Sequence, residues 1–169
     1  MGTAPSVRLP LVVALAAALT LGSGCDDDPA GIVDAAEFLA NLTGAAERPD
    51  PVTTDATGTA FFDVDGSTVR FRIEVEDIEN VTLAHIHNGG VDVAGPIVVE
   101  LFNAAGTPRS FTARGVLVES TFTEADFEAA GGITTLDALI DAMDAGTVYV
   151  NVHTTQNPAG EIRGQIEET

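Results

Sequence analysis

The stretch Thr68–Glu76, TVRFRIEVE, indicates the fold class of this 169-residue chain. Polar or charged residues alternate along its whole length with an apolar set, Val69, Phe71, Ile73 and Val75. Because successive side chains of a β-strand point to opposite faces, the alternation predicts a strand with one buried and one solvated face. Strands of that kind are typical of antiparallel sheets.

Segments of similar character lie on both sides of this strand. Before it, ATGTAFFDV (56–64) is joined to it by Asp65-Gly66-Ser67, which favours a hairpin turn. The other segments that we interpret as strands are EFLANLTG (37–44), NVTLAHIHN (80–88), GPIVVELFN (95–103), RSFTARGVLVES (109–120), TVYVNVHT (147–154) and GEIRGQIEE (160–168). Their spacing predicts a mostly β protein, an antiparallel β-sandwich or flattened barrel of about 7–8 strands.

A short helical insertion interrupts this series of strands. Thr134 and Asp137 have the spacing of a capping box, which marks the start of a helix. An apolar stripe at helical spacing follows, made of Leu136, Leu139, Ile140 and Met143. Gly146 is expected to end this helix, and a shorter helical turn is expected at 124–129.

The first 24 residues are typical of an export signal. Arg8 precedes an apolar run, LVVALAAALTL (11–21), that is too short to span a membrane. GSGC (22–25) then supplies small residues that end in the single cysteine of the chain, Cys25. The segment resembles a bacterial lipoprotein signal, which implies that Cys25 is acylated and becomes the first residue of the mature protein. The alternative is an ordinary signal peptide with an incidental cysteine.

We therefore expect three parts: a lipoprotein-type signal peptide at 1–24, an acidic tether at 25–36 and a β domain at 37–169. The tether begins with DDDP after Cys25 and shows little apolar periodicity. This organisation predicts an exported, lipid-anchored protein of the bacterial cell envelope, at the periplasmic face or the cell surface. Its membrane partner would be reached through the lipid on Cys25.

The charge balance excludes some classes of partner. The formal net charge is −19, so DNA, RNA and anionic membrane surfaces would repel the chain. Cations and basic protein surfaces remain compatible with it. The sequence identifies no particular protein or cation as the ligand.

Six motifs in this sequence occur in the order found in the CHRD domain, which is named after the signalling antagonist chordin. They are LTGAAERPDP (42–51), ATGTAFF (56–62), AHIHNGG (84–90), GPIVVEL (95–101), YVNVHT (149–154) and NPAGEIRGQI (157–166). The chain therefore resembles this family over about 37–167. The resemblance implies an extracytoplasmic β domain whose biochemical role is largely unassigned. The growth-factor binding of chordin itself is not carried over to this chain.

The three histidines of the chain lie in two of these motifs. His85 and His87 are two residues apart, so on a strand they project from the same face, about 6.5–7 Å apart. His153 lies on a later strand, on the face opposite to its neighbouring valines. Three neutral imidazoles around an open position suit copper or zinc. The arrangement is similar to the copper half-site of copper–zinc superoxide dismutases, but the bridging histidine, zinc loop and disulfide of those enzymes are missing.

Three further residues are candidates for a supporting role. Asn151 and Glu161 are candidate hydrogen-bonding partners that fix an imidazole tautomer. Glu161 and Arg163 are also candidates for a partly buried ion pair near the histidines. Two alternatives to a metal site stay open: a structural polar cluster bonded to backbone carbonyls or carboxylates, and a binding or catalytic site without metal.

The strand that carries the first two histidines has an ambiguous phase. Val81 and Leu83 have the same alternation phase as His85 and His87, although apolar and polar residues normally occupy opposite faces. Either the histidines are partly buried, or a β-bulge changes the register within this strand.

No common catalytic motif is present in the sequence, which lacks G-x-S-x-G, H-E-x-x-H and a phosphate-cradling glycine loop. The first hypothesis is therefore a membrane-tethered, non-enzymatic binding or structural module. The second is a copper- or zinc-binding protein, with or without redox activity, that uses His85, His87 and His153. The third is a matrix or adhesion component whose acidic surface binds cations.

Overall fold

The structure is a computed structural model that describes residues 1–2 and 36–169. The predicted signal peptide, Cys25 and nearly all of the predicted tether lie outside the described residues, so those predictions stay predictions. Among the described residues, no helix is long and apolar enough to cross a membrane.

The domain is mostly β, as the alternation in the sequence predicts. Its strands are β1 (Phe38–Thr43), β2 (Thr57–Asp65), β3 (Thr68–Glu76), β4 (Ile78–Asn88), β5 (Ile97–Asn103), β6 (Arg109–Phe111), β7 (Gly115–Phe122), β8 (Val148–Thr154), β9 (Ile162–Gln165) and β10 (Glu167–Glu168). Over the described residues they form one antiparallel sheet in the order β5-β4-β8-β9-β1-β2-β3-β7. The short β6 pairs with β4, and β10 pairs with β1.

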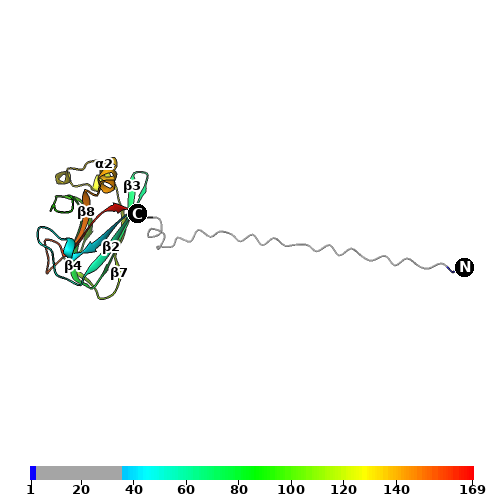
Figure 1. The fold of residues 1–169 in the computed structure, drawn as a ribbon, viewed down its shortest axis with the longest axis horizontal. Coiled ribbons are helices and arrows are strands. Elements are labelled where there is room, and N and C mark those ends of the chain that lie inside the picture. The colour runs from blue at the N-terminus through cyan, green and yellow to red at the C-terminus, as the bar shows by residue number, and fades with distance from the viewer. Residues whose placement is uncertain (3–35) are drawn as a thin grey trace.

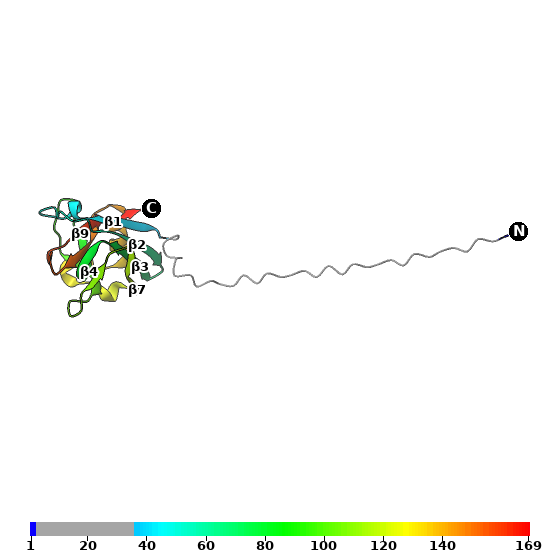
Figure 2. The same ribbon diagram turned by 90° about the horizontal axis from the view of Figure 1, so that it is seen from below.

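This sheet curls into a nearly closed barrel (Figures 1 and 2). Figure 2 shows β9, β1, β2, β3, β7 and β4 arranged as a ring. The inward-facing side chains fill the barrel, and those on β3 are the apolar set that the sequence alternation singles out: Val69, Phe71, Ile73 and Val75. The predicted flattened barrel is therefore confirmed.

The hairpin between β2 and β3 forms where the sequence predicts it. The turn consists of Gly66 and Ser67, and Gly66 has a φ of 61°. A residue without a Cβ adopts that left-handed conformation without strain. The pairing runs without a break from Asp65 opposite Thr68 to Thr57 opposite Glu76.

Two of the predicted strands are divided in the structure. The segment 109–120 is divided between β6 and β7, and the segment 160–168 between β9 and β10. β6 pairs with β4, whereas β7 pairs with β3. β9 pairs with both β8 and β1, whereas β10 pairs with β1. The ten strands of residues 36–169 exceed the predicted number for this reason.

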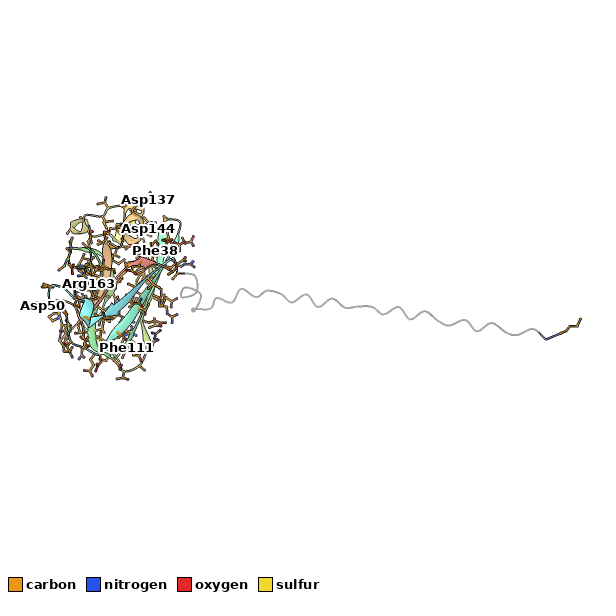
Figure 3. The ribbon with its side chains drawn as sticks, viewed as in Figure 1. Phe38, Asp50, Phe111, Asp137, Asp144 and Arg163 are labelled. Carbon is orange, nitrogen blue, oxygen red and sulfur yellow. The ribbon has the colours of Figure 1, made fainter. Side chains whose placement is uncertain are left out.

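The helix, α2 (Leu136–Asp144), lies at the top of Figure 1 and contacts β8 and β10. Its N-cap is Thr135, which accepts a hydrogen bond from the backbone N–H of Ala138. The predicted cap at Thr134 is therefore wrong by one residue. Asp137 and Asp144 mark the two ends of the helix in Figure 3.

The shorter predicted helix at 124–129 is also corrected. The structure has two 3-10 turns instead, η2 (Glu124–Asp126) and η3 (Ala129–Gly131). Between them Phe127 forms an isolated bridge with Val99, and the N–H of Glu128 donates to the carbonyl of Val98. The segment leaves the helical path because it pairs with the edge of β5.

A bulge in β4 decides which face its histidines occupy. Val81 pairs with Thr154, but Leu83 pairs with His153, so the register shifts by one residue between them. Ahead of the shift, Val81 faces the core; beyond it, the core residues are Ala84 and Ile86. The alternative of a register change is confirmed, and His85 and His87 lie on the outer face of the barrel.

Candidate metal centre

The three histidines lie together on the outer face of β4 and β8. Directly opposite residues of an antiparallel pair share a face, and the register places Leu83 opposite His153, His85 opposite Asn151 and His87 opposite Tyr149. The same face of the sheet continues onto β9, where Arg163 lies opposite Asn151. Sequence reasoning placed the three histidines on strands, and the pairing brings them side by side.

This outer face is nevertheless buried. His85 is 4% exposed, and His87 and His153 are each 8% exposed. Loops cover it: the 89–96 loop contributes Gly95, the 155–160 loop contributes Pro158, and the 3-10 turn η1 (Gly44–Ala46) brings in the segment that follows it. Burial therefore comes from the loops and not from the barrel core.

Two backbone carbonyls fix the tautomers of two of the rings. His87 Nδ1–H donates to Gly95 O at 2.9 Å, and His153 Nδ1–H donates to Pro158 O at 3.1 Å. In a neutral imidazole the other nitrogen is then a lone pair, so both rings present Nε2 as an acceptor or metal ligand. His85 Nδ1–H donates to His153 Nε2 at 2.9 Å.

The nitrogen atoms of this cluster are close enough to share one ion. One ring nitrogen from each histidine lies within 4.8 Å of those of the other two. Nitrogens bound at about 2.0–2.1 Å to a tetrahedral ion lie roughly 3.4 Å apart, so small ring movements suffice. His87 Nε2 is buried and has no hydrogen-bond partner among the described residues. Its lone pair lacks the donor that a buried acceptor requires.

The electrostatic environment keeps the rings neutral. Burial, together with the neighbouring His153 and His87, lowers the pKa of His85 to about 3. Burial also lowers the pKa of His87 and of His153. The Gly95 carbonyl and the Asn151 side chain act in the opposite direction on the pKa of His87, and the Pro158 carbonyl does so on that of His153. Neutral imidazole is the form that binds a metal ion.

Arg163 supports the site through an aromatic ring and not through an ion pair. Its guanidinium carbon lies 3.4 Å from the centroid of the Tyr149 ring, and that ring stacks on His87 with centroids 4.9 Å apart. Its Nη2 donates to Gly90 O and to Gln165 Oε1. Figure 3 labels Arg163 in the left part of the domain.

Glu161 is held by hydroxyl and amide donors and not by the histidines. Its carboxylate accepts hydrogen bonds from Thr54 Oγ1, Thr154 Oγ1 and Asn157 Nδ2, at 2.8, 2.7 and 3.0 Å. Among the described residues it forms no ion pair with Arg163, so the expected pair of Glu161 and Arg163 is wrong. The carboxylate instead ties the 155–160 loop to β8 and to the loop before β2.

Among the candidate supporting residues, Asn151 is the one that the strand pairing places directly opposite a histidine, His85. Its Nδ2 donates to Glu47 Oε1 at 3.3 Å and to Ala159 O at 3.4 Å. Because both partners are acceptors, the amide oxygen must point the other way. Asn151 Oδ1 is buried and has no hydrogen-bond partner among the described residues.

Glu47 and Tyr149 belong to the site but were not singled out by the sequence. Tyr149 could have been found, because it alternates with Asn151 and His153 on the same face of one strand. Glu47 lies in a loop, where no periodicity marks it. It is 3% exposed, and burial raises its pKa to about 7, opposed by the hydrogen bond from Asn151 and by the charge of Arg163.

A cavity of about 240 Å³ opens beside the cluster. His85 forms part of its wall, together with Ile97 and Ala130 and with two carboxylates, those of Glu100 and Glu128. Of the three histidines, His85 is the one that lines this cavity. The cavity is therefore the route from solvent to the cluster.

The fold and the cluster together define the class of domain: an antiparallel β-barrel with a buried three-histidine cluster on its outer face. The family model of the CHRD domain matches residues 38–166, which is most of the chain. The chain belongs to the CHRD domain family, as its six sequence motifs indicate. Comparisons with curated proteins and with solved structures gave no match.

Proposed function

We propose that this chain is a membrane-tethered CHRD module of the bacterial cell envelope that binds a copper or zinc ion at His85, His87 and His153. The role is binding and not catalysis. The observation that carries the proposal is the cluster itself, in which one nitrogen from each ring lies within 4.8 Å of the others. Three imidazole nitrogens are a ligand set that suits either metal.

The orphaned nitrogen favours an ion over a purely structural cluster. His87 Nε2 is buried, carries a lone pair and has no donor among the described residues. Leaving a buried acceptor unsatisfied costs about 1–3 kcal/mol. An ion bound to this nitrogen would remove that cost.

A structural polar cluster is the second candidate. The hydrogen bond of 2.9 Å between His85 Nδ1 and His153 Nε2 favours it, because it satisfies both atoms without a metal. The two candidates differ in whether this bond is replaced by two metal–nitrogen bonds when an ion is supplied.

Metal titration of the full chain in detergent, stripped with chelator, tests the proposal. We expect calorimetry to show one equivalent of Zn²⁺ or Cu²⁺ bound per chain. In His87→Asn and His153→Asn, the new Nδ2 replaces the Nδ1–H donor to Gly95 O or Pro158 O, while the Nε2 ligand is lost. These variants should keep the circular dichroism of the wild type and lose affinity by more than about 100-fold, since partners behind metal ligands alone contribute about 10–100-fold. Wild-type protein that takes up no ion would establish the structural cluster instead.

The tether is supported by the sequence of the first 25 residues, and it has its own test. In a bacterial host, the chain should incorporate labelled palmitate and fractionate with membranes. Cys25→Ser should lose the label and, if exported, appear in the soluble fraction. An unlabelled wild-type chain would refute the lipid anchor without affecting the metal proposal.

A further inference from the structure

Asn151 lies at the centre of the three histidines. The register places it directly opposite His85 on β4. His87 is its diagonal neighbour on the same strand, and His153 is two residues further along β8, on the same face. Opposite pairs on one face have Cβ atoms about 4.5–5.5 Å apart, and long side chains reach their diagonal neighbours.

The orientation of the Asn151 amide is fixed by its partners. Both Nδ2 hydrogen bonds end on oxygen atoms, Glu47 Oε1 and Ala159 O. Gly160 fits tightly against this arrangement, since a Cβ there would lie 2.3 Å from Asn151 Nδ2 and 2.6 Å from Glu47 Oε1. Because Nδ2 faces these two acceptors, the amide oxygen is directed toward the histidine side.

Two buried acceptors thus remain without a donor in one place. His87 Nε2 is a lone pair because Nδ1–H is used by Gly95 O, and Asn151 Oδ1 is a lone pair because Nδ2 is used by Glu47 and Ala159. Neither atom has a hydrogen-bond partner among the described residues. Two acceptors cannot satisfy each other, but both can bind the same cation.

We propose that Asn151 is a fourth ligand of the metal centre through Oδ1, and that Glu47 is the residue that positions it. This inference rests on the proposed function and makes the ligand set three nitrogens and one oxygen. A four-coordinate set of this kind closes the position that three histidines would leave open. The site is then a storage or structural metal site with a closed shell, and an amide oxygen favours a divalent ion over Cu⁺.

Glu47 is the acidic group behind the proposed fourth ligand. The four ligands are neutral, and the nearby Arg163 guanidinium is positive, so a divalent ion would add positive charge to a buried region. Glu47 is the carboxylate that hydrogen-bonds to the Asn151 side chain. It acts on the metal through Asn151 without touching it, and a bound cation favours its ionised form.

The test uses the full chain in detergent, with Co²⁺ as a spectroscopic probe and Zn²⁺ for affinity. We expect intense visible absorption from four-coordinate Co²⁺ in the wild type. Asn151→Ala should change that spectrum and weaken Zn²⁺ binding by about 10–100-fold. Asn151→Asp keeps an oxygen ligand but loses both Nδ2 donor bonds to Glu47 and Ala159, so it should stay four-coordinate with a shifted Co²⁺ spectrum and a changed Zn²⁺ affinity. If Asn151→Ala does not fold, Asn151→Asp alone decides, and an affinity and spectrum unchanged from the wild type would overturn the proposal.

Positioning by Glu47 has a separate signature. Glu47→Ala should shift the Co²⁺ spectrum because it releases the Asn151 side chain, and Glu47→Gln should restore the spectrum because its amide oxygen can still accept from Nδ2. Asn88→Ala is the matched control. It removes an amide at the end of β4 that donates to Gly131 O in η3, and it should leave the spectrum unchanged.

The two levels of the proposal fail in different ways. Wild-type protein that binds Zn²⁺ with the same affinity and Co²⁺ spectrum as Asn151→Ala would overturn the fourth ligand and leave the three-histidine site standing. Wild-type protein that binds neither ion would overturn both.

Discussion

The ring of Tyr149 lies parallel to the imidazole of His87, with 4° between their planes and 4.9 Å between their centroids. The same two residues are joined through Gly95, whose N–H donates to the Tyr149 hydroxyl and whose carbonyl accepts from His87 Nδ1. Since the Arg163 guanidinium covers the tyrosine ring as well, Tyr149 is held between a cation and a candidate metal ligand. The stack thus fixes the plane of the His87 ring.

Removing this stack should destabilise the domain more than removing the hydroxyl. Tyr149→Phe keeps both stacked faces and loses one hydrogen bond, for an expected cost of about 1 kcal/mol. Tyr149→Leu also removes the ring and should cost roughly 2–4 kcal/mol, as large-to-small core substitutions do. Urea unfolding of the metal-free protein measures both. Equal losses for the two variants would mean that the ring contributes nothing beyond its hydroxyl.

Glu47→Gln should raise stability at alkaline pH but not at acid pH. Burial raises the pKa of Glu47 from 4.5 to about 7, so between those values the folded state binds more protons than the unfolded state. The stability that protonated Glu47 provides is present below pH 4.5 and is lost as the pH rises through 7. Glutamine does not ionise, so the variant should match the wild type near pH 4 and exceed it by up to about 3 kcal/mol near pH 8. Denaturant titrations across this range check the sign, and a difference that does not change with pH contradicts it.

Gly160→Ala should damage the site from a position that contacts no histidine directly. Gly160 has a φ of 134°, and its added Cβ would overlap both Asn151 Nδ2 and Glu47 Oε1. We expect a loss of about 2–4 kcal/mol in the free energy of unfolding. Gly66→Ala is the control, since Gly66 also has positive φ but nothing lies within 4 Å of its Cβ position. Its cost should be only about 1–2 kcal/mol, and equal costs would refute the clash.

The two threonines ahead of α2 should differ in their contribution to stability. Both are exposed, but Thr135 accepts the hydrogen bond from the Ala138 N–H. Thr135→Ala should therefore cost about 1 kcal/mol, whereas Thr134→Ala should stay within about 0.5 kcal/mol. Thermal unfolding of the pair measures this difference, and the reverse order would restore Thr134 as the cap.

The parts of the fold that the sequence predicts are those with a regular period. β3 was predicted in full because each of its side chains faces either the barrel core or solvent. The period fails where the backbone deviates: the bulge between Val81 and Leu83 leaves no mark in the sequence beyond a conflict of phase. Two adjacent threonines are chemically equal as caps, so the first residue of α2 could not be read from their identity.

The site residues on regular strands could be predicted from the sequence, and the site residue in a loop could not. Alternation places Tyr149, Asn151 and His153 on one face, and the family motifs group the histidines, so most of the cluster could be predicted. Glu47 could not, because it reaches Asn151 across 104 residues of sequence and comes from a loop. The expected partnership of Glu161 with Arg163 failed for a physical reason: hydroxyl and amide donors already occupy the Glu161 carboxylate.

The position of β1 gives the domain a defined mechanical axis. β1 starts at Phe38, where the chain enters the barrel, and η1 and Glu47 follow its far end, where Glu47 contacts Asn151 of the candidate metal centre. It pairs with β2 on one side and with β9 and β10 on the other. A pull between the preceding chain and a partner held near Glu47 would run along the covalent backbone of β1, which is already extended. The hydrogen bonds of β1 to its neighbours would not carry that load, so the barrel would not have to open under it.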